Sequence, residues 1–222
     1  MNTSIETIPS PVGPLTCVVR GDTLAILEME ENVDRVRACL SRMRIDPADL
    51  DRAATPSDVA RRIGAYFEGD LGALDAIDVV AHGTPFEQRV YAELRKIPCG
   101  EVISYTELAR RAGRPEAVRA AGATNAKNPI AIVVPCHRVI GADGSLTGYA
   151  GGLERKRWLL AHEGALGAGR ATRSLLVGEG ARVAGGASMD VSASASEAGS
   201  RPDRSPPAAA RSRAVGGARC SA

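Results

Sequence analysis

The sequence of 222 residues has no long apolar run, few cysteines and few histidines. A transmembrane helix needs about 18 or more consecutive apolar residues, and no stretch approaches that length. Residues 1–14 lack a basic segment followed by an apolar run, so they do not match a secretory signal. Together with a mean hydropathy of −0.09, these absences predict a globular protein of the cytoplasm and exclude a membrane-spanning one.

The cysteines are too few and too scattered to predict a disulfide framework or a CxxC zinc site. They are Cys17, Cys39, Cys99, Cys136 and Cys220. The first three are expected to be structural, and the last has no assigned role. The three histidines are scattered as well, so we expect no metal and no cofactor. A zinc site built from residues distant in sequence is the less favoured alternative.

Charge is unevenly distributed, although the net charge is only +2. Residues 1–94 carry nine basic and sixteen acidic side chains, whereas residues 95–158 carry eleven basic and five acidic ones. A basic central segment favours contact with a polyanion. However, 25 of the 28 basic residues are arginine, so a coding bias would give the same pattern. Charge alone leaves both interpretations open.

Residues 1–83 predict a small α+β domain. Short strands are expected over residues 5–8, 15–19 and 24–29. The first two strands flank a turn rich in proline and glycine. One helix is expected after Asn32 as its N-cap, and a second from Thr55-Pro56, with proline in its first turn. No catalytic group of residues stands out in this domain.

Residues 84–167 predict a second, mostly helical domain. Thr84–Glu87 and Ser104–Glu107 each match a helix capping box. Short helices over Tyr105–Ala112 and Glu116–Thr124 resemble a helix-turn-helix. Such a pair is typical of DNA-binding domains, but it also occurs as a plain packing unit, so the pattern alone leaves both open.

The last predicted helix is Leu153–His162, with Gly164 as its stop. From residue 168 onward the composition is dominated by alanine, glycine, serine, arginine and proline. Such a segment cannot bury enough apolar surface to offset the entropy of ordering it. We therefore expect residues 168–222 to be a disordered tail.

Cys136 follows the apolar run Ile130–Val134, which is typical of a buried strand or extended segment. Cysteine attacks as the thiolate, and a free thiol with a pKa of about 8.5 is mostly protonated at neutral pH, so a base is needed. His137 is next in sequence and, on an extended segment, would act through a bridging water. Glu163 is the candidate to orient the imidazole. A buried structural cysteine is the commoner explanation of such a pattern.

The segment Pro135–Val139 resembles the active-site signature of the O6-alkylguanine-DNA alkyltransferases (methylated-DNA–protein-cysteine methyltransferases). Other segments agree at consistent spacings: Thr84–Phe86, Gly100–Tyr105, Arg119–Gly122, Asn128-Pro129, Tyr149–Gly152 and Trp158–Gly164. The likeness covers residues 84–164 strongly and residues 1–83 more loosely. It implies an α+β fold, with a ribonuclease H-like N-terminal domain and a winged-helix-like C-terminal domain that binds DNA.

The resemblance implies that Cys136 irreversibly accepts an alkyl group from O6-alkylguanine, or O4-alkylthymine, in double-stranded DNA. His137 would deprotonate it through a water, and Glu163 would orient His137. Tyr105 would support rotation of the nucleotide and protonate the leaving guanine, while Asn128 would hold the active-site turn. The protein would act once, as a monomer, with no cofactor.

The resemblance also implies how DNA is held. The target oxygen lies inside the duplex, so the nucleotide must be flipped out, and Arg119 would fill the gap that it leaves. Small residues on the recognition helix would permit close approach to the minor groove. The implied DNA contacts are Thr106, Arg119, Ala120, Gly122 and Arg138. The implied pocket residues are Tyr149, Ala150 and Gly151.

Three departures and two alternatives accompany this resemblance. Ala150 stands where some relatives carry serine, which leaves the substrate breadth open. The zinc site and the amino-terminal phosphotriester-repair module of some relatives have no counterpart. A non-catalytic lesion-binding protein on the same fold is disfavoured because Cys136, His137 and Glu163 are all present. A Cys-His hydrolase is disfavoured because no oxyanion-hole signature is evident.

Overall fold

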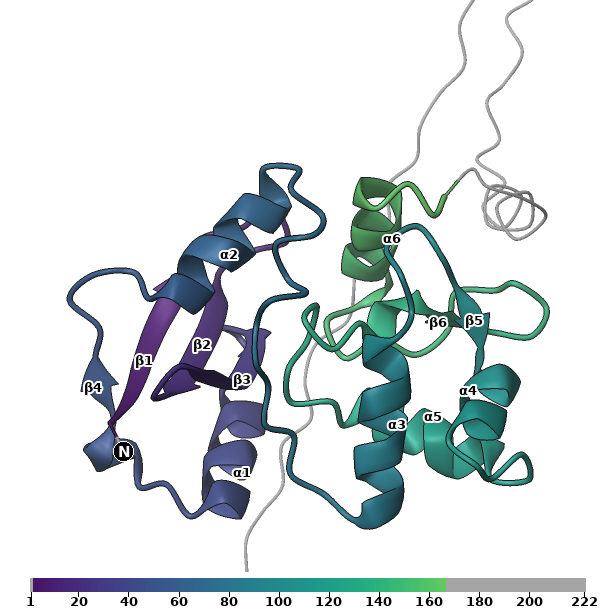
Figure 1. Cartoon of the computed structure of the whole chain (residues 1–222), viewed down its shortest axis with the longest axis horizontal. Helices are drawn as coiled ribbons and strands as arrows, with labels where there is room; N and C mark the ends of the chain where they lie inside the picture. Colours follow the sequence, from purple (N-terminus) through teal and green to yellow (C-terminus); the bar gives the residue numbers. More distant parts are fainter. Residues whose placement is uncertain (1, 167–222) are drawn as a thin grey trace, which may run out of the picture. The chain divides into compact units, whose positions relative to one another are not determined.

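The computed structural model describes residues 2–166, all of which lie in the compact unit Met1–Gly180 (Figure 1). These residues form a mixed α+β fold with a small N-terminal sheet, as predicted. No helix among them is long and apolar enough to cross a membrane. The predicted tail, with Cys220, lies outside the described residues.

Four strands form the N-terminal sheet in the order β3-β2-β1-β4. They are β1 (Thr3–Ile8), β2 (Leu15–Arg20), β3 (Thr23–Met29) and the short β4 (Asp51–Arg52), which the 3-10 turn η1 (Pro47–Asp49) precedes. β2 is antiparallel to both β1 and β3, whereas β4 runs parallel to β1. The three predicted strands are confirmed, each longer by one or two residues.

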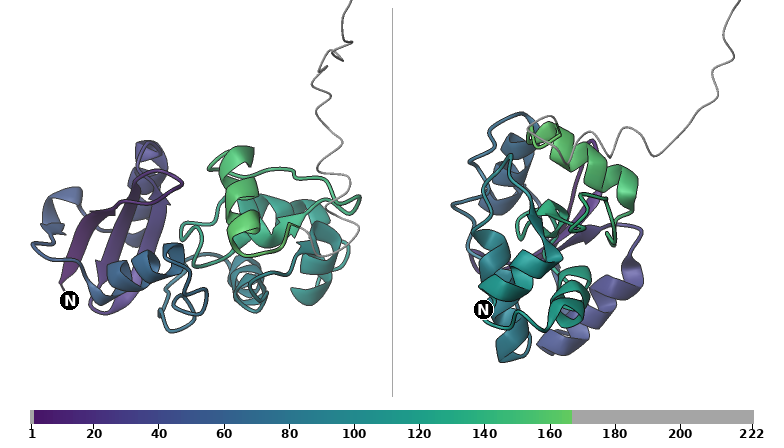
Figure 2. Two further views of the ribbon diagram at one scale, coloured as in Figure 1. Left: turned by 90° about the horizontal axis from the view of Figure 1, so that it is seen from above. Right: turned by 90° about the vertical axis from the view of Figure 1, so that its right-hand side faces the viewer.

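Both faces of this sheet are covered. Successive side chains of a strand point to opposite sides, so neighbouring residues pack in two different apolar clusters. Val18 packs with helix α1 (Val33–Met43) in one apolar cluster. Its neighbour Cys17 packs in the other cluster, which contains helix α2 (Asp58–Phe67) (Figures 1 and 2). That second cluster also contains side chains from the helices after residue 84, so one core runs through both predicted domains. The boundary at residue 83 therefore stays a prediction.

Four helices and one short strand pair make up the rest of the fold. They are α3 (Pro85–Arg95), α4 (Tyr105–Arg111), α5 (Val118–Ala126) and α6 (Leu153–His162), with the parallel strands β5 (Ile103–Ser104) and β6 (Val139–Ile140) and the 3-10 turn η2 (Cys136–Arg138). α4 packs against α3 and α5. Because β5 leads directly into α4 and β6 directly follows η2, their pairing brings Tyr105 towards Cys136.

Two helices start later than predicted, and a side-chain hydrogen bond accounts for one of them. α2 begins at Asp58, because the Ser57 hydroxyl accepts from the backbone N–H of Ala60 at 3.0 Å. The predicted start at Thr55-Pro56 is therefore wrong, and the proline precedes the helix. α5 begins at Val118, two residues after its predicted start. No side chain caps α5, and apolar periodicity locates a helix end only to within one or two residues.

The predicted caps form to different extents. The capping box of Thr84 and Glu87 is complete in both directions. Ser104 caps α4 by accepting from the Glu107 backbone, but the Glu107 carboxylate pairs with arginines of its own helix. Asn32 occupies the N-cap of α1 without capping it, since its amide donates to the Glu28 carboxylate at 2.9 Å.

Candidate active site

Cys136 is positioned by a buried turn. The run Ile130–Val134 is buried as predicted, but only Ile130 pairs with a strand, through a single bridge to Leu27. The backbone then turns, with Ile132 at φ 71°. A left-handed conformation is costly for a β-branched residue, so the surroundings must hold it in place.

The Asn128 side chain is the group that holds this turn. Its amide donates to the carbonyls of Val134 at 2.7 Å and Ile130 at 3.3 Å, and its oxygen accepts from the Ile130 backbone at 3.1 Å. Asn125, which the sequence analysis missed, donates to the Cys136 carbonyl at 3.2 Å. Two buried amides thus fix the backbone on both sides of the thiol.

The Cys136 thiol is buried, with 6% of the residue exposed. Burial raises the pKa of Cys136, and hydrogen bonding to Asn128 and the charge of Lys156 only partly oppose this. The resting side chain is therefore a protonated thiol at neutral pH. A nucleophilic role requires a base close by.

His137 is fully buried beside that thiol, within the same 3-10 turn. Its Nε2 lies 2.9 Å from Oε1 of Glu163. Burial lowers the pKa of His137, although Glu163 works in the opposite direction. The imidazole is therefore neutral at pH 7, with Nε2–H donating to the carboxylate. That tautomer leaves Nδ1 as the proton acceptor.

Glu163 collects hydrogen bonds from three side chains. It accepts from Nε2 of His137, from the Tyr66 hydroxyl at 2.8 Å, and from two nitrogens of Arg138 at 2.8 Å each. Burial alone would raise the pKa of Glu163, but the bonds from His137 and Arg138 outweigh it and hold that pKa well below its usual range. The carboxylate stays ionised and orients the imidazole.

Arg138 lies inside the protein, away from the DNA contact predicted for it. Only 6% of the residue is exposed, and its guanidinium donates to Glu163, to the Ile97 carbonyl and to the Cys99 sulfur. A guanidinium occupied in this way is not available to a phosphate.

Tyr66, which lies on α2, was not predicted as a site residue. Nothing in its neighbouring residues indicates that its hydroxyl donates to Glu163.

Tyr105 lies at the start of α4 with its hydroxyl directed at the loop after β6. The hydroxyl donates to the carbonyls of Thr147 at 3.2 Å and Gly148 at 3.3 Å. Lys156 is fully buried and donates to the same Thr147 carbonyl at 2.8 Å and to that of Val139 at 2.6 Å. Burial lowers the pKa of Lys156 to about 8. The burial of Lys156 could not be predicted from the sequence, because a lysine on a helix is usually exposed.

The predicted pocket residues line a cavity over Cys136. Tyr149, Ala150 and Gly151 form one wall, and Glu28 and Arg35 from the N-terminal part of the chain contribute another. The cavity measures about 10 Å³, room for about one water molecule and far too little for a nucleobase. A Cβ on Gly151 would lie 2.8 Å from the Tyr149 ring, so only glycine fits there.

Three buried polar side-chain atoms lack a hydrogen-bond partner among residues 2–166, and all belong to this site. They are Nδ1 of His137, Oδ1 of Asn125 and the hydroxyl of Tyr149. Leaving a buried polar group unpaired costs about 1–3 kcal/mol, so proteins rarely keep one without a reason. Asn125 and Tyr149 line the cavity over Cys136, and His137 follows that cysteine directly in the chain. The unpaired atoms mark the surroundings of the thiol as a place where a ligand would supply the missing partners.

The remaining predicted contacts lie on the helix pair. Arg119 and Ala120 on α5 are exposed, as is Thr106 in the first turn of α4. Gly122 faces the Tyr105 ring, which a Cβ would meet at 3.6 Å. The structure therefore leaves these residues accessible to a large partner. Among the described residues, no group of three or more potential ligands could hold a metal ion.

Comparison with known proteins gives consistent results. Residues 85–165 match the family model for the DNA-binding domain of 6-O-methylguanine DNA methyltransferase. A methylated-DNA–protein-cysteine methyltransferase of Salmonella typhimurium is 46% identical over 163 residues, covering 72% of this chain and 95% of that protein. One from Mycobacterium tuberculosis is 45% identical over 155 residues, covering 70% and 88%.

A solved structure agrees with these relatives. The crystal structure of Mycobacterium tuberculosis OGT in complex with DNA has a TM-score of 0.60 to this fold at 41% identity. The match covers 73% of this chain and 93% of that one. The archaeal O6-methylguanine-DNA methyltransferase of Pyrococcus kodakaraensis gives a TM-score of 0.53 at 28% identity.

Proposed function

Because the chain belongs to the methylated-DNA–protein-cysteine methyltransferase family, we propose that Cys136 is a single-use acceptor for the alkyl group of O6-alkylguanine in double-stranded DNA. O4-alkylthymine is the second substrate of this proposal. The supporting observation is the concentration of unpaired buried polar atoms around Cys136. The protein acts as a monomer and needs no cofactor.

The proton moves from the thiol to His137. The Cys136 proton passes through a water to Nδ1, and Glu163 stabilises the imidazolium that forms. The thiolate then attacks the alkyl carbon, so a carbon–sulfur bond forms as the bond from carbon to guanine O6 breaks. The electron pair of that bond stays with the guanine. A thioether is not readily reversed, so each molecule acts once.

Tyr105 completes the transfer on the guanine side. Its hydroxyl protonates the leaving guanine and regains a proton from solvent, while the imidazolium returns its proton to solvent. The charge on guanine is thereby neutralised as the bond to carbon breaks. Tyr105 already lies at the pocket wall, where its hydroxyl reaches the Thr147 and Gly148 carbonyls.

DNA binds to the helix pair, and the lesion leaves the duplex. The cavity over Cys136 is too small for a base in the free protein, so flipping and pocket opening go together. Arg119 fills the gap in the stack, while Ala120, Gly122 and Thr106 permit close approach to the backbone. We assign Arg138 a positioning role through Glu163 in place of a DNA contact.

Peptide mapping after reaction with an oligonucleotide duplex containing O6-methylguanine tests this proposal. We expect one methyl group on the peptide that contains Cys136. Cys136→Ala should accept none, whereas Cys39→Ala, altered at a buried cysteine of the other apolar cluster, should accept it normally. Methylation of Cys136→Ala would refute the assignment. Tight binding of the lesion without transfer would favour the non-catalytic lesion-binding alternative.

A further inference from the structure

One guanidinium joins the pocket wall to the N-terminal part of the chain. Arg155, in the first turn of α6, donates through Nη1 to the Gly151 carbonyl at 3.0 Å and through Nε to the Val12 carbonyl at 2.6 Å. Nη1 also pairs with the Glu31 carboxylate at 2.6 Å. The side chain lies close against the hairpin turn, because a Cβ on Gly13 would come within 3.3 Å of it.

The segment that Arg155 holds is the wall that must move. Gly148 and Gly152 both have positive φ, 48° and 88°, and bracket the three pocket residues between them. Gly151 is confined between the Tyr149 ring and the end of the Met29 side chain at the end of β3. Since the cavity is about 10 Å³, its lining must move before a base can enter. The loop between the two glycines belongs to no helix or strand and is partly exposed, so it is the part of the lining best placed to move.

The two ends of this wall are held with different strength. At the Thr147 end the carbonyl accepts from Lys156, which is fully buried, and from Tyr105. At the Gly151 end the holding group is Arg155, whose side chain is 29% exposed and whose partner Glu31 is 53% exposed. A partly solvated ion pair exchanges its partners for water more readily than a fully buried hydrogen bond does. The Gly151 end is therefore where the wall opens.

From this geometry we propose that Arg155 is a specificity-determining latch that limits how far the pocket wall opens and so favours small alkyl groups over bulky ones. The inference rests on the proposed function. A methyl group adds little to the volume of guanine, whereas a benzyl group requires a wider opening. Each additional displacement of the wall must stretch the contacts through which Arg155 links Gly151 to Val12 and Glu31.

Single-turnover rate constants with two oligonucleotide duplexes test the latch, one containing O6-methylguanine and the other O6-benzylguanine. Arg155→Met keeps the length of the side chain and removes every donor. We expect the ratio of the benzyl to the methyl rate constant to rise about tenfold, the equivalent of about 1.4 kcal/mol. Arg157→Met is the matched control, because Arg157 pairs on the same helix with exposed Glu154. That control should leave the ratio unchanged.

Glu31→Gln is a second variant that leaves the helix and its arginine intact. It should raise the ratio in the same direction by a smaller factor, since the bonds from Arg155 to Gly151 and Val12 persist. An unchanged ratio in both variants, or an equal fall of both rate constants in Arg155→Met, would overturn the latch. Failure of the wild-type protein to take methyl from its duplex would instead refute the proposed function.

Discussion

At the scale of single residues, the proposed chemistry depends on a base that stays neutral and a thiol that stays protonated until it reacts. The buried His137 has a lowered pKa, and the buried Cys136 has a raised one. A preformed thiolate is therefore absent at pH 7. In the proposed reaction, proton transfer from Cys136 to His137 therefore accompanies attack, so the rate of alkyl transfer should depend on pH.

We expect the single-turnover rate constant of the wild-type protein to be constant from about pH 7 to 8. It should fall at pH values below the usual histidine pKa of about 6.5. The sign follows from the lowered pKa of His137, because the imidazole loses its acceptor only once it is protonated. His137→Gln should be slower and rise about tenfold per pH unit, since it relies on spontaneous ionisation of the thiol. A flat profile for this variant would contradict the base assignment.

Tyr66 provides a test of the carboxylate network. Tyr66→Phe removes one donor from Glu163 while keeping the ring in place. We expect the free energy of unfolding in urea at pH 7 to fall by about 1–2 kcal/mol. Because the folded-state pKa of Glu163 lies below the unfolded value, its stabilisation is present above that unfolded value and lost as pH falls further. The difference between wild type and variant should therefore persist as pH falls through the unfolded value and shrink only near the folded-state pKa of Glu163. A difference that already vanishes at the unfolded value would contradict the role of Glu163.

Site residues could be predicted from the sequence where the neighbouring residues form a recognisable pattern. Cys136, His137 and Glu163 belong to sequence segments with a recognisable pattern, and the structure places all three together. Tyr66 and Lys156 act through contacts made only after folding. Nothing in their neighbouring residues distinguishes them from an ordinary buried tyrosine or an exposed helical lysine. The resemblance suggested a surface role for Arg138, which tertiary packing overrides.

At the scale of elements, the helix pair combines two requirements that compete at Gly122. Glycine within a helix costs about 1 kcal/mol relative to alanine, so its presence in α5 lowers stability. A Cβ there would make only an ordinary contact with the Tyr105 ring at 3.6 Å. Packing therefore does not require glycine, whereas the proposed close approach of DNA would favour it.

Gly122→Ala should raise the free energy of unfolding by up to about 1 kcal/mol and weaken duplex binding. Gly64→Ala is the matched control, because Gly64 lies inside α2 with open space where a Cβ would be. It should stabilise the fold to a similar extent without any change in the dissociation constant for DNA. Equal DNA binding by the two variants would remove Gly122 from the interface.

Strand positions were predictable because each short apolar run is bounded by turn residues, and the hairpin turns of the sheet lie at those residues. Helix starts were less predictable. The start of α2 is set by the Ser57 hydroxyl, which caps the helix, and not by the proline of Thr55-Pro56. The run Ile130–Val134 shows a further limit. Its apolar composition predicts burial, but the turn within it depends on Asn128, which precedes the run and acts through its side chain.

At the scale of the whole molecule, the N-terminal sheet and helices contribute to the site although they contain no reacting group. Arg35 on α1 donates to the carbonyls of Ala126 and Asn128 at 3.2 Å each and pairs with Glu28 at 2.6 Å. Glu28 is buried and lines the cavity over Cys136. The N-terminal part therefore supports the turn that holds the thiol, which residue patterns within either part do not reveal.

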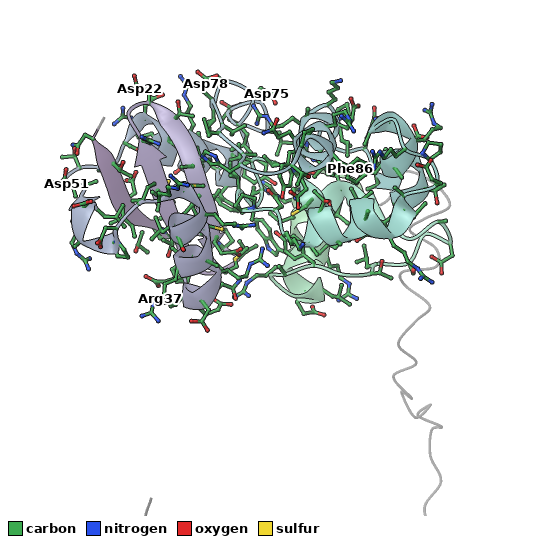
Figure 3. The ribbon with its side chains drawn as sticks, turned by 90° about the horizontal axis from the view of Figure 1, so that it is seen from below. Asp22, Arg37, Asp51, Asp75, Asp78 and Phe86 are labelled. Carbon is green, nitrogen blue, oxygen red and sulfur yellow. The ribbon has the colours of Figure 1, made fainter. Side chains whose placement is uncertain are left out.

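Arg35→Met should lower the free energy of unfolding by about 2–3 kcal/mol, somewhat less than for a fully buried pair, because it leaves the Glu28 carboxylate without its cation. The rate of alkyl transfer should fall as well. Arg37→Met is the control, since Arg37 extends from the same helix (Figure 3) with 73% of its side chain exposed. It should change neither quantity. If both variants behave alike in urea unfolding and in transfer, Arg35 does not couple the two parts.

The most direct test of the central claim is a titration of the protein with excess duplex containing O6-methylguanine, in which the repaired guanine is counted. We predict that repaired guanine rises to one equivalent per protein molecule and then stops, as intact mass shows one methyl group replacing one proton. Continued repair beyond one equivalent, or repair with no mass change on the protein, would contradict Cys136 as a single-use acceptor.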